Sequence, residues 1–190
     1  MKTSHPIRPA RAPHAVRTIA ATGMAIALAL GVTACATSKP SAVATAQLEP
    51  TRGNTANGSV RFEQIGDKVR VSGTVRGLPP GAQLGFHVHE KGDCSSGDGM
   101  SAGGHFNPGG TPHGRHGAGP HHAGDLPSLV VDAAGQARID FVTSSISVGR
   151  GANSVLDRGL IVHRDPDDYT TQPTGNAGPR LACGVIRQGS

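Results

Sequence analysis

The feature that most constrains the fold is a series of short segments in which apolar and polar residues alternate, separated by turns. Residues 60–65 and 69–75 alternate on either side of a Gly66-Asp67 turn, and similar short segments continue to residue 186. Alternation with a period of two is typical of half-buried strands, and no segment shows a convincing helical period. The 28 glycines and 14 prolines among 190 residues fit a chain rich in turns. The sequence therefore predicts an all-β sandwich or barrel.

Two long stretches without a strand pattern, residues 90–127 and 164–179, interrupt this series. Loops of this length are unusual in a compact domain and usually carry function. Between them, residues 128–132 and 137–142 alternate on either side of a short turn and are predicted to pair as a hairpin.

The N-terminal residues 1–34 have the pattern of an export signal. A basic stretch is followed by the apolar residues 19–32, which are too few to span a bilayer comfortably, since about 20 are needed. The string Val32-Thr33-Ala34-Cys35 resembles the bacterial lipobox, in which lipid is attached to the cysteine. The alternative is an ordinary secretory signal with an incidental cysteine. Both predict an exported protein, and the first predicts a lipid anchor at Cys35 in a membrane.

The signal segment also explains most of the net charge of +5, because it contains four basic residues and no acid. Residues 35–190 are nearly neutral, whereas a protein that binds phosphates keeps its charge in the folded part. Aromatic residues, on which bases could stack, make up only 3%. We therefore exclude nucleic acid as a partner. Residues 35–56 are small and polar and are predicted to form a flexible tether, which leaves residues 57–190 as the folded domain.

The cysteines support export. If Cys35 carries lipid, Cys94 and Cys183 remain as a pair in an oxidising compartment, where a disulfide is favoured over two free thiols.

Histidines are the strongest chemical signal in the chain. His87 and His89 form a His-x-His pair on a predicted strand, so alternation places both rings on one face and Phe86 and Val88 on the other. Several imidazoles and one carboxylate on one side of a sheet suit Zn²⁺ or Cu²⁺. The histidines outside the signal segment are His87, His89, His105, His113, His116, His121, His122 and His163. The alternative for some of them is a purely structural role, in which the ring makes hydrogen bonds within the loop. This is plausible for His116 and for one of His121 and His122.

Five ordered motifs resemble the copper/zinc superoxide dismutase family, and the exported bacterial branch most closely. The resemblance covers about residues 57–188 and implies a Greek-key barrel or sandwich of about eight antiparallel strands with two long functional loops. The motifs are Gly85-Phe-His-Val-His-Glu-Lys-Gly-Asp-Cys94, Gly103-Gly-His-Phe-Asn-Pro108, His122-Ala-Gly-Asp-Leu-Pro127, Leu160-Ile-Val-His163 and Gly175-Asn-Ala-Gly-Pro-Arg-Leu-Ala-Cys-Gly-Val-Ile186.

The resemblance implies a role for each matching residue. Asp167 corresponds to a carboxylate that tethers a copper-ligand histidine to a zinc-ligand histidine, Arg180 to an arginine that attracts the anionic substrate, and Cys94 and Cys183 to the disulfide. His105 corresponds to the histidine that bridges the two metals. The copper ligands would be His87, His89, His105 and His163, and the zinc ligands His105, His113, His122 and Asp125. The His-x-x-Asp spacing favours His122 over His121, and the choice of His113 over His116 stays open.

The implied activity is dismutation of superoxide to molecular oxygen and hydrogen peroxide. One copper ion per subunit would cycle between Cu(II) and Cu(I), one zinc ion would tie the bridging histidine, and His105 would donate a proton. The enzyme would protect the cell envelope from superoxide formed outside the cytoplasm. The oligomeric state stays open, with a homodimer as one alternative. Two other functions are alternatives: a copper-binding or copper-delivery module without turnover, and a zinc hydrolase with Glu90 as its base.

Overall fold

The structure, a computed structural model, describes residues 41–189. The expected export signal and the lipid site at Cys35 lie outside these residues. Between residues 41 and 189 no helix is long and apolar enough to cross a membrane. A single 3-10 helix, Met100–Ala102, accompanies the strands in this part of the chain. The strands are β1 (Val43–Pro50), β2 (Asn57–Ile65), β3 (Lys68–Arg76), β4 (Gln83–Leu84), β5 (Phe86–His89), β6 (Leu129–Val130), β7 (Ala137–Thr143), β8 (Gly159–His163), β9 (Arg180–Val185) and β10 (Arg187–Gln188).

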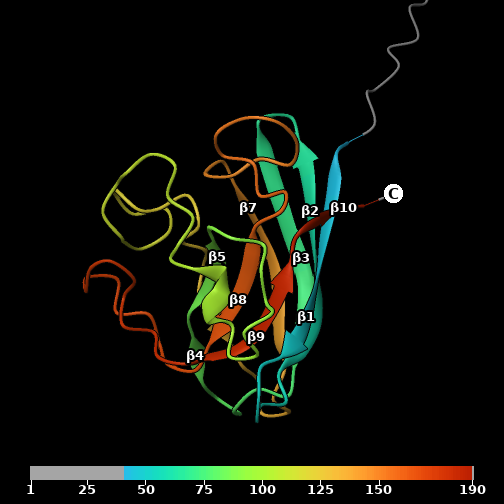
Figure 1. Cartoon of the computed structure of the whole chain (residues 1–190), viewed down its shortest axis with the longest axis vertical. Helices are drawn as coiled ribbons and strands as arrows, with labels where there is room; N and C mark the ends of the chain where they lie inside the picture. The colour runs from blue at the N-terminus through green and yellow to red at the C-terminus, as the bar shows by residue number, and fades with distance from the viewer. Residues whose placement is uncertain (1–40, 190) are drawn as a thin grey trace, which may run out of the picture. The chain divides into compact units, whose positions relative to one another are not determined.

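Antiparallel pairing joins eight of these strands into one sheet. Its order is β5-β8-β9-β1-β2-β3-β7, and β10 also pairs with β1. Strands β4 and β6 form a separate two-stranded sheet. Figure 1 shows β5 and β8 on one side of the molecule and β1, β2 and β3 on the other, with the sheet curving between them. The all-β fold of antiparallel strands is confirmed.

Alternating side chains build the core inside this curve. Val60 and Phe62 of β2 are fully buried, as are Phe86 and Val88 of β5 at the far end of the sheet. All four belong to one continuous hydrophobic cluster, so β2 and β5 contribute to a shared core inside the curved sheet. The intervening residues of β2, such as Arg61, face the solvent, as a period of two requires.

Strands β5 and β8 differ because all their residues are buried on both faces. One face of β5 packs its apolar side chains into the core, and the other carries His87 and His89. The two long loops cover that second face, and Figure 1 shows both on the β5 side of the molecule. Polar side chains buried in this way need partners, which the loops supply.

One expectation about the domain boundary is wrong. The tether predicted over residues 35–56 contains β1, which pairs with both β2 and β9. Its small and apolar side chains Ala44, Ala46 and Leu48 alternate and are buried. Their size suits a position inside the sheet, although small residues in the sequence suggested a linker. The folded part therefore includes Val43, well before residue 57.

The predicted hairpin between residues 128–132 and 137–142 is also not formed as expected. A turn is present, because the Asp132 N–H donates to the Gln136 carbonyl over 2.8 Å. Beyond it the two segments do not pair with each other. Strand β6 pairs with β4, and β7 pairs with β3. Each segment obtains its hydrogen bonds from a strand distant in sequence.

Candidate metal centre

The loop of residues 90–127 attaches to the free edge of β5. Val88 is the attachment point: its N–H donates to the Gly124 carbonyl over 2.9 Å, and its carbonyl accepts from the Phe106 N–H over 2.8 Å. These bonds satisfy an edge that would otherwise stay unpaired. They also place His105 opposite His89 and Asp125 opposite His87 in the backbone pairing.

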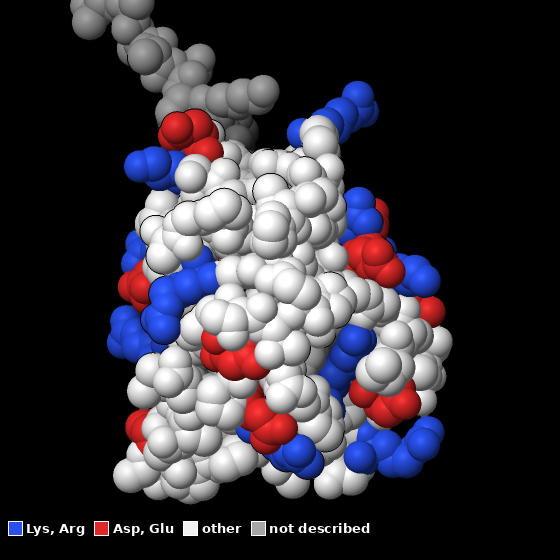
Figure 2. Space-filling view, turned by 90° about the vertical axis from the view of Figure 1, so that its left-hand side faces the viewer, with Lys and Arg blue, Asp and Glu red and all other residues white. Residues whose placement is uncertain are grey.

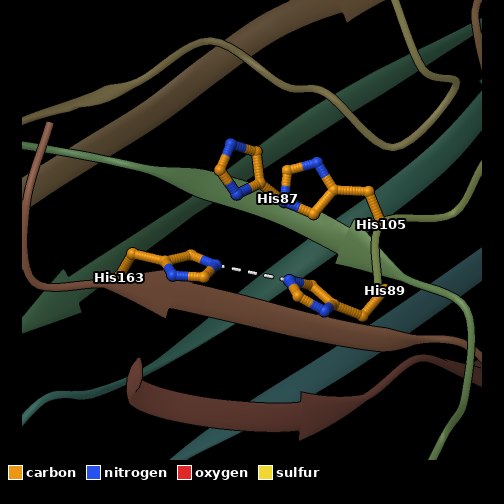
Figure 3. Close-up of side chains that lie close together, drawn as sticks. All are labelled: His87, His89, His105 and His163. Atoms are coloured by element: carbon orange, nitrogen blue, oxygen red, sulfur yellow. Dashed lines mark hydrogen bonds between the residues drawn. The ribbon is translucent and has the colours of Figure 1, made fainter. Parts of the chain in front are cut away.

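Four imidazoles meet at this edge. His87 and His89 come from β5, His163 from the end of β8 and His105 from the loop, and Figure 3 shows them gathered over the two strands. One nitrogen from each of the four rings lies within 4.8 Å of the other three. The Nε2 atoms of His89 and His163 are 3.3 Å apart. These distances are compatible with a single ion bound between the rings.

Backbone carbonyls orient two of these rings. The Nδ1–H of His89 donates to the Gly103 carbonyl over 2.9 Å, and the Nδ1–H of His163 donates to the Gly178 carbonyl over 3.1 Å. Each ring therefore keeps the Nε2 lone pair for the cluster. Metal-binding histidines usually have their second nitrogen held in this way.

His87 is oriented by a carboxylate instead. Its Nε2–H donates to Asp167 Oδ2 over 2.8 Å, which leaves Nδ1 facing the other imidazoles. That Nδ1 atom and His105 Nε2 are both buried and have no hydrogen-bond partner among the described residues. Buried nitrogens without a partner are costly in a folded protein, and a bound cation would satisfy them. The donor set, four imidazoles, fits copper.

A second cluster adjoins the first and shares His105. Asp125 Oδ1 lies 2.9 Å from His105 Nδ1 and 3.0 Å from His113 Nδ1. His122 Nδ1 completes the group, 3.4 Å from Asp125 Oδ1 and 3.4 Å from His105 Nδ1. Three imidazoles and one carboxylate, all buried, match the ligand number and types of a closed zinc site.

Asp167 connects the two clusters from behind. Its Oδ2 accepts from His87 of the first cluster, and its Oδ1 accepts from His113 Nε2 of the second over 2.8 Å. Both bonds use the ring nitrogen that points away from the cluster. One buried carboxylate therefore orients a ring in each cluster.

The structure separates the spare histidines from the clusters. His116 donates from Nδ1 to the Asp125 backbone carbonyl over 2.9 Å. His121 contacts the Gly119 carbonyl through Nδ1 and the Ser145 hydroxyl through Nε2. Neither belongs to a group that could hold a metal, whereas His113 and His122 do.

Burial lowers the pKa of three imidazoles in the first cluster. Desolvation lowers the pKa of His87 to about 4 and that of His163 to about 3, although hydrogen bonds oppose the shift in both cases. Desolvation also lowers the pKa of His89. These rings are therefore neutral at pH 7, and a metal needs the neutral form because it binds the lone pair.

The second cluster behaves differently because two carboxylates, Asp125 within it and Asp167 beside it, bond His113. Burial opposes a charge on His113, but hydrogen bonds to Asp125 and Asp167 outweigh it and raise the pKa of His113 to about 9. Hydrogen bonds with His105 and His113 hold the pKa of Asp125 well below its usual range, and those with His113 and His87 do the same for Asp167, in both cases against the effect of burial. A metal that binds His113 Nδ1 must displace a proton, so its positive charge would replace that of the imidazolium.

Arg180 lies at the start of β9, and the loop of residues 90–127 holds its guanidinium. It donates to the Gly99 carbonyl over 2.5 Å and to the Gly103 carbonyl over 2.6 Å. Gly103 also orients His89, which places the guanidinium near the first cluster. Desolvation lowers the pKa of Arg180, which nonetheless stays charged at neutral pH. Among residues 41–189 no carboxylate forms an ion pair with it.

The expected disulfide is confirmed. Cys94 and Cys183 are bonded, with their Cα atoms 5.8 Å apart. The bond ties the loop after β5 to β9 across 89 residues of sequence. A structural disulfide fits a protein that is exported to an oxidising compartment.

Sequence reasoning missed the backbone groups of the site. The carbonyls of Gly103 and Gly178 orient two histidines, and the side chain of Gln172 bonds the backbone of His113 at both N–H and C=O. Every residue has a carbonyl, so no residue type marks these positions in a sequence.

The fold and the site together define a class of protein: an all-β metalloprotein with two adjoining buried metal sites that share one histidine. Comparisons with known proteins identify the family. The family model described as copper/zinc superoxide dismutase matches residues 56–186. The chain therefore belongs to the copper/zinc superoxide dismutase family, which consists of enzymes with copper and zinc as cofactors.

Individual relatives agree with this assignment. "Superoxide dismutase [Cu-Zn] 2" from Aquifex aeolicus is 40% identical over 134 residues, which cover 68% of this chain and 78% of the relative. "Extracellular superoxide dismutase [Cu-Zn]" from Brugia pahangi is 40% identical over 154 residues, covering 76% and 75%. A solved structure titled "Crystal Structure Analysis of the clock protein EA4" is 42% identical and superposes with a TM-score of 0.71, covering 78% of this chain and 96% of that one.

Gly175 shows how closely the loops pack around Asp167. A Cβ atom at this position would lie 2.0 Å from Asp167 Oδ1 and 2.5 Å from His113 Nε2. We expect Gly175→Ala to displace the hydrogen bond between Asp167 Oδ1 and His113 Nε2 and to weaken zinc binding by about 10–100-fold, measured by chelator competition. Gly110→Ala is the control, because Gly110 also has a positive φ but open space around it. Equal zinc affinity in the two variants would contradict this prediction.

Proposed function

We propose that this protein dismutates superoxide to molecular oxygen and hydrogen peroxide. The observation that carries the proposal is His105, whose two ring nitrogens face two different buried clusters. A histidine shared in this way can couple a redox-active ion to a second ion that holds the ring in place.

The nitrogens that each ring leaves free support a ligand assignment. Copper would be held by His87 Nδ1, His89 Nε2, His163 Nε2 and His105 Nε2, in agreement with the orientation of each ring by its second nitrogen. The zinc ligands would be His105, His113 and His122 through Nδ1, together with Asp125. This assignment uses one copper and one zinc ion per chain.

Copper held by these residues would supply the one-electron chemistry, by cycling between Cu(II) and Cu(I), and no side chain of the cluster could replace it. Two superoxide anions and two protons are converted to one dioxygen and one hydrogen peroxide. His105 would supply one of those protons: Nε2 would take it up from the solvent and pass it to the product, while Nδ1 faces the second cluster. Asp167 keeps His87 and His113 in place throughout, because it bonds both rings at once.

Arg180 would draw the anion toward the copper cluster. Its guanidinium is held at two corners by backbone carbonyls, which leaves its remaining N–H groups for a substrate. Figure 2, which views the side of the molecule that carries the two loops, shows Lys and Arg interspersed with Asp and Glu. With no large basic patch on that face, attraction depends on the local arginine.

The sequence and the disulfide support a place of action outside the cytoplasm. The signal-like segment of residues 1–34 and the disulfide support an exported enzyme. We infer that it acts in the cell envelope, held to a membrane by lipid at Cys35, and removes superoxide formed outside the cytoplasm.

Rapid mixing of superoxide with the copper- and zinc-loaded protein tests the proposed activity. We expect many superoxide ions to be consumed for each copper ion, with oxygen and peroxide formed in equal amounts. Consumption of a single equivalent would assign the protein to copper binding or delivery and would overturn the proposal.

Arg180→Ala should lower kcat/KM for superoxide by about 10–100-fold, because the variant loses the charge that concentrates the anion. Its rate should also depend less on ionic strength than that of the wild type. Arg180→Lys should retain part of the rate, since it keeps the charge without the planar fork. Arg70→Ala is the control for net charge, because Arg70 on β3 forms an ion pair with Asp140 on β7. An equal loss in both alanine variants would remove Arg180 from this role.

A further inference from the structure

Tyr169 has a backbone conformation that aromatic residues rarely adopt. It lies two residues after Asp167, in the loop between β8 and β9, and its φ is +59°. Bulky residues in the left-handed region are outliers that persist only where surrounding contacts hold them. Such positions often mark functional sites, where the strain is offset by surrounding contacts.

Contacts from two other segments hold its side chain. The guanidinium carbon of Arg115 lies 4.1 Å from the centre of the Tyr169 ring, a cation–π contact. The Tyr169 hydroxyl lies 2.8 Å from the Ser128 hydroxyl oxygen, at hydrogen-bond distance. Arg115 belongs to the loop that supplies His113 and His122, and Ser128 directly follows that loop. Arg115 and Ser128 thus hold the ring between them.

The backbone of Tyr169 contacts the carboxylate that links the two clusters. Its N–H donates to Asp167 Oδ1 over 2.8 Å. The same oxygen accepts from His113 Nε2, and the second oxygen of Asp167 accepts from His87 Nε2. The N–H of Tyr169 therefore provides a third bond that fixes the carboxylate linking the two clusters.

We propose that Tyr169 is a positioning residue for the zinc site. Its ring, clamped between Arg115 and Ser128, holds its N–H against Asp167, and Asp167 in turn holds His113 in the orientation that zinc requires. The clamp also ties the loop of residues 164–179 to the loop of residues 90–127. This inference rests on the proposed function, because it takes the second cluster to be the zinc site.

A competing explanation is that the local turn holds the backbone without help from the ring. The Asp168 side chain accepts hydrogen bonds from the Thr170 and Thr171 N–H groups. Asparagine at position 169 separates the two explanations, because Asn adopts the left-handed conformation more readily than Tyr but cannot form the clamp. Tyr169→Asn relieves the backbone and removes the ring in one change.

The experiment measures zinc release from the fully loaded protein to a chromophoric chelator. We expect Tyr169→Asn to release zinc about 10-fold faster than the wild type, within the range for residues that orient metal ligands. Tyr169→Phe keeps the stacked ring and loses only the hydroxyl, so it should release zinc about 2- to 5-fold faster, as for the loss of one hydrogen bond. Ser128→Ala should match Tyr169→Phe, since it removes the other half of the same contact.

Two measurements distinguish positioning from general stability. The melting temperature of the metal-free Tyr169→Asn protein should equal or exceed that of the wild type, because the strained backbone is relieved. Arg115→Lys should release zinc faster, since lysine loses the planar stacking on the ring. Arg70→Lys, at an arginine on β3, is the matched control and should leave zinc release unchanged.

The outcomes decide between the explanations. Unchanged zinc release from Tyr169→Asn would overturn the clamp, and so would faster release accompanied by a matching fall in the metal-free melting temperature. A wild-type protein that takes up no zinc would overturn the proposed function and this inference together. Zinc uptake by the wild type with normal release from Tyr169→Asn would overturn this inference alone.

Discussion

Replacing His105 with alanine is expected to abolish superoxide turnover and to release zinc. The variant removes one ligand from each cluster, since His105 is the only residue common to both groups within the described chain. Loss of a residue that merely orients a ligand costs about 10–100-fold in metal affinity, so loss of a shared ligand should cost at least about 100-fold. We expect kcat/KM to fall by a similar factor or more. Metal analysis and rapid-mixing kinetics measure the two effects.

His121→Ala is the matched control for His105→Ala. Both histidines belong to the same loop, but His121 contacts only the Gly119 carbonyl and the Ser145 hydroxyl and lies outside both clusters. Its substitution should leave the metal content and the turnover rate close to wild type. If His105→Ala retained full zinc and normal turnover, His105 would lose its assigned role as the bridge.

Removing the disulfide is expected to produce the largest loss of stability. The Cys94–Cys183 bond closes a long loop, and restriction of the unfolded chain by such a loop nominally stabilises the fold by about 4–5 kcal/mol. Removal of a native disulfide from small secreted domains typically costs about 2–5 kcal/mol. For a domain of this size that corresponds to a melting temperature roughly 10 °C lower. Calorimetry of the Cys94→Ala/Cys183→Ala double variant measures the shift.

The same variant should also affect the copper site. Cys94 lies in the loop whose Gly99 and Gly103 carbonyls hold Arg180, and Cys183 lies on the strand that begins with Arg180. Without the bond this loop should move more freely, so kcat/KM should fall even below the melting transition. A double variant with wild-type melting temperature and rate would show that packing alone holds the loop.

Much of the fold was accessible from the sequence because its signals are local. Alternation in residues 60–65 and 69–75 reflects covalent neighbours on opposite faces of a strand, and both segments form strands as expected. The alternation of His87 and His89 with Phe86 and Val88 likewise separated the site from the core. The sequence pattern failed at β1, where small residues suggested a linker, since their fit beside β2 and β9 depends on neighbours distant in sequence.

The site was predictable in its residue types but not in its detailed geometry. Spacing alone left His113 and His116 as alternatives, and the structure brings only His113 between Asp125 and Asp167. The difference arises from the path of the loop, which turns His116 toward a backbone carbonyl instead.

From the residues alone one could derive β2 and β3, the chemical nature of the ligands and the two loops that carry them, because these depend on residue type and short-range order. Tertiary structure alone decided which ring nitrogen each histidine keeps free. That choice is made by partners such as Gly103 for His89 and Asp167 for His87, which are 14 and 80 residues away. A lone pair is directed by the hydrogen bond on the opposite side of its ring, and only the folded chain brings that partner within reach.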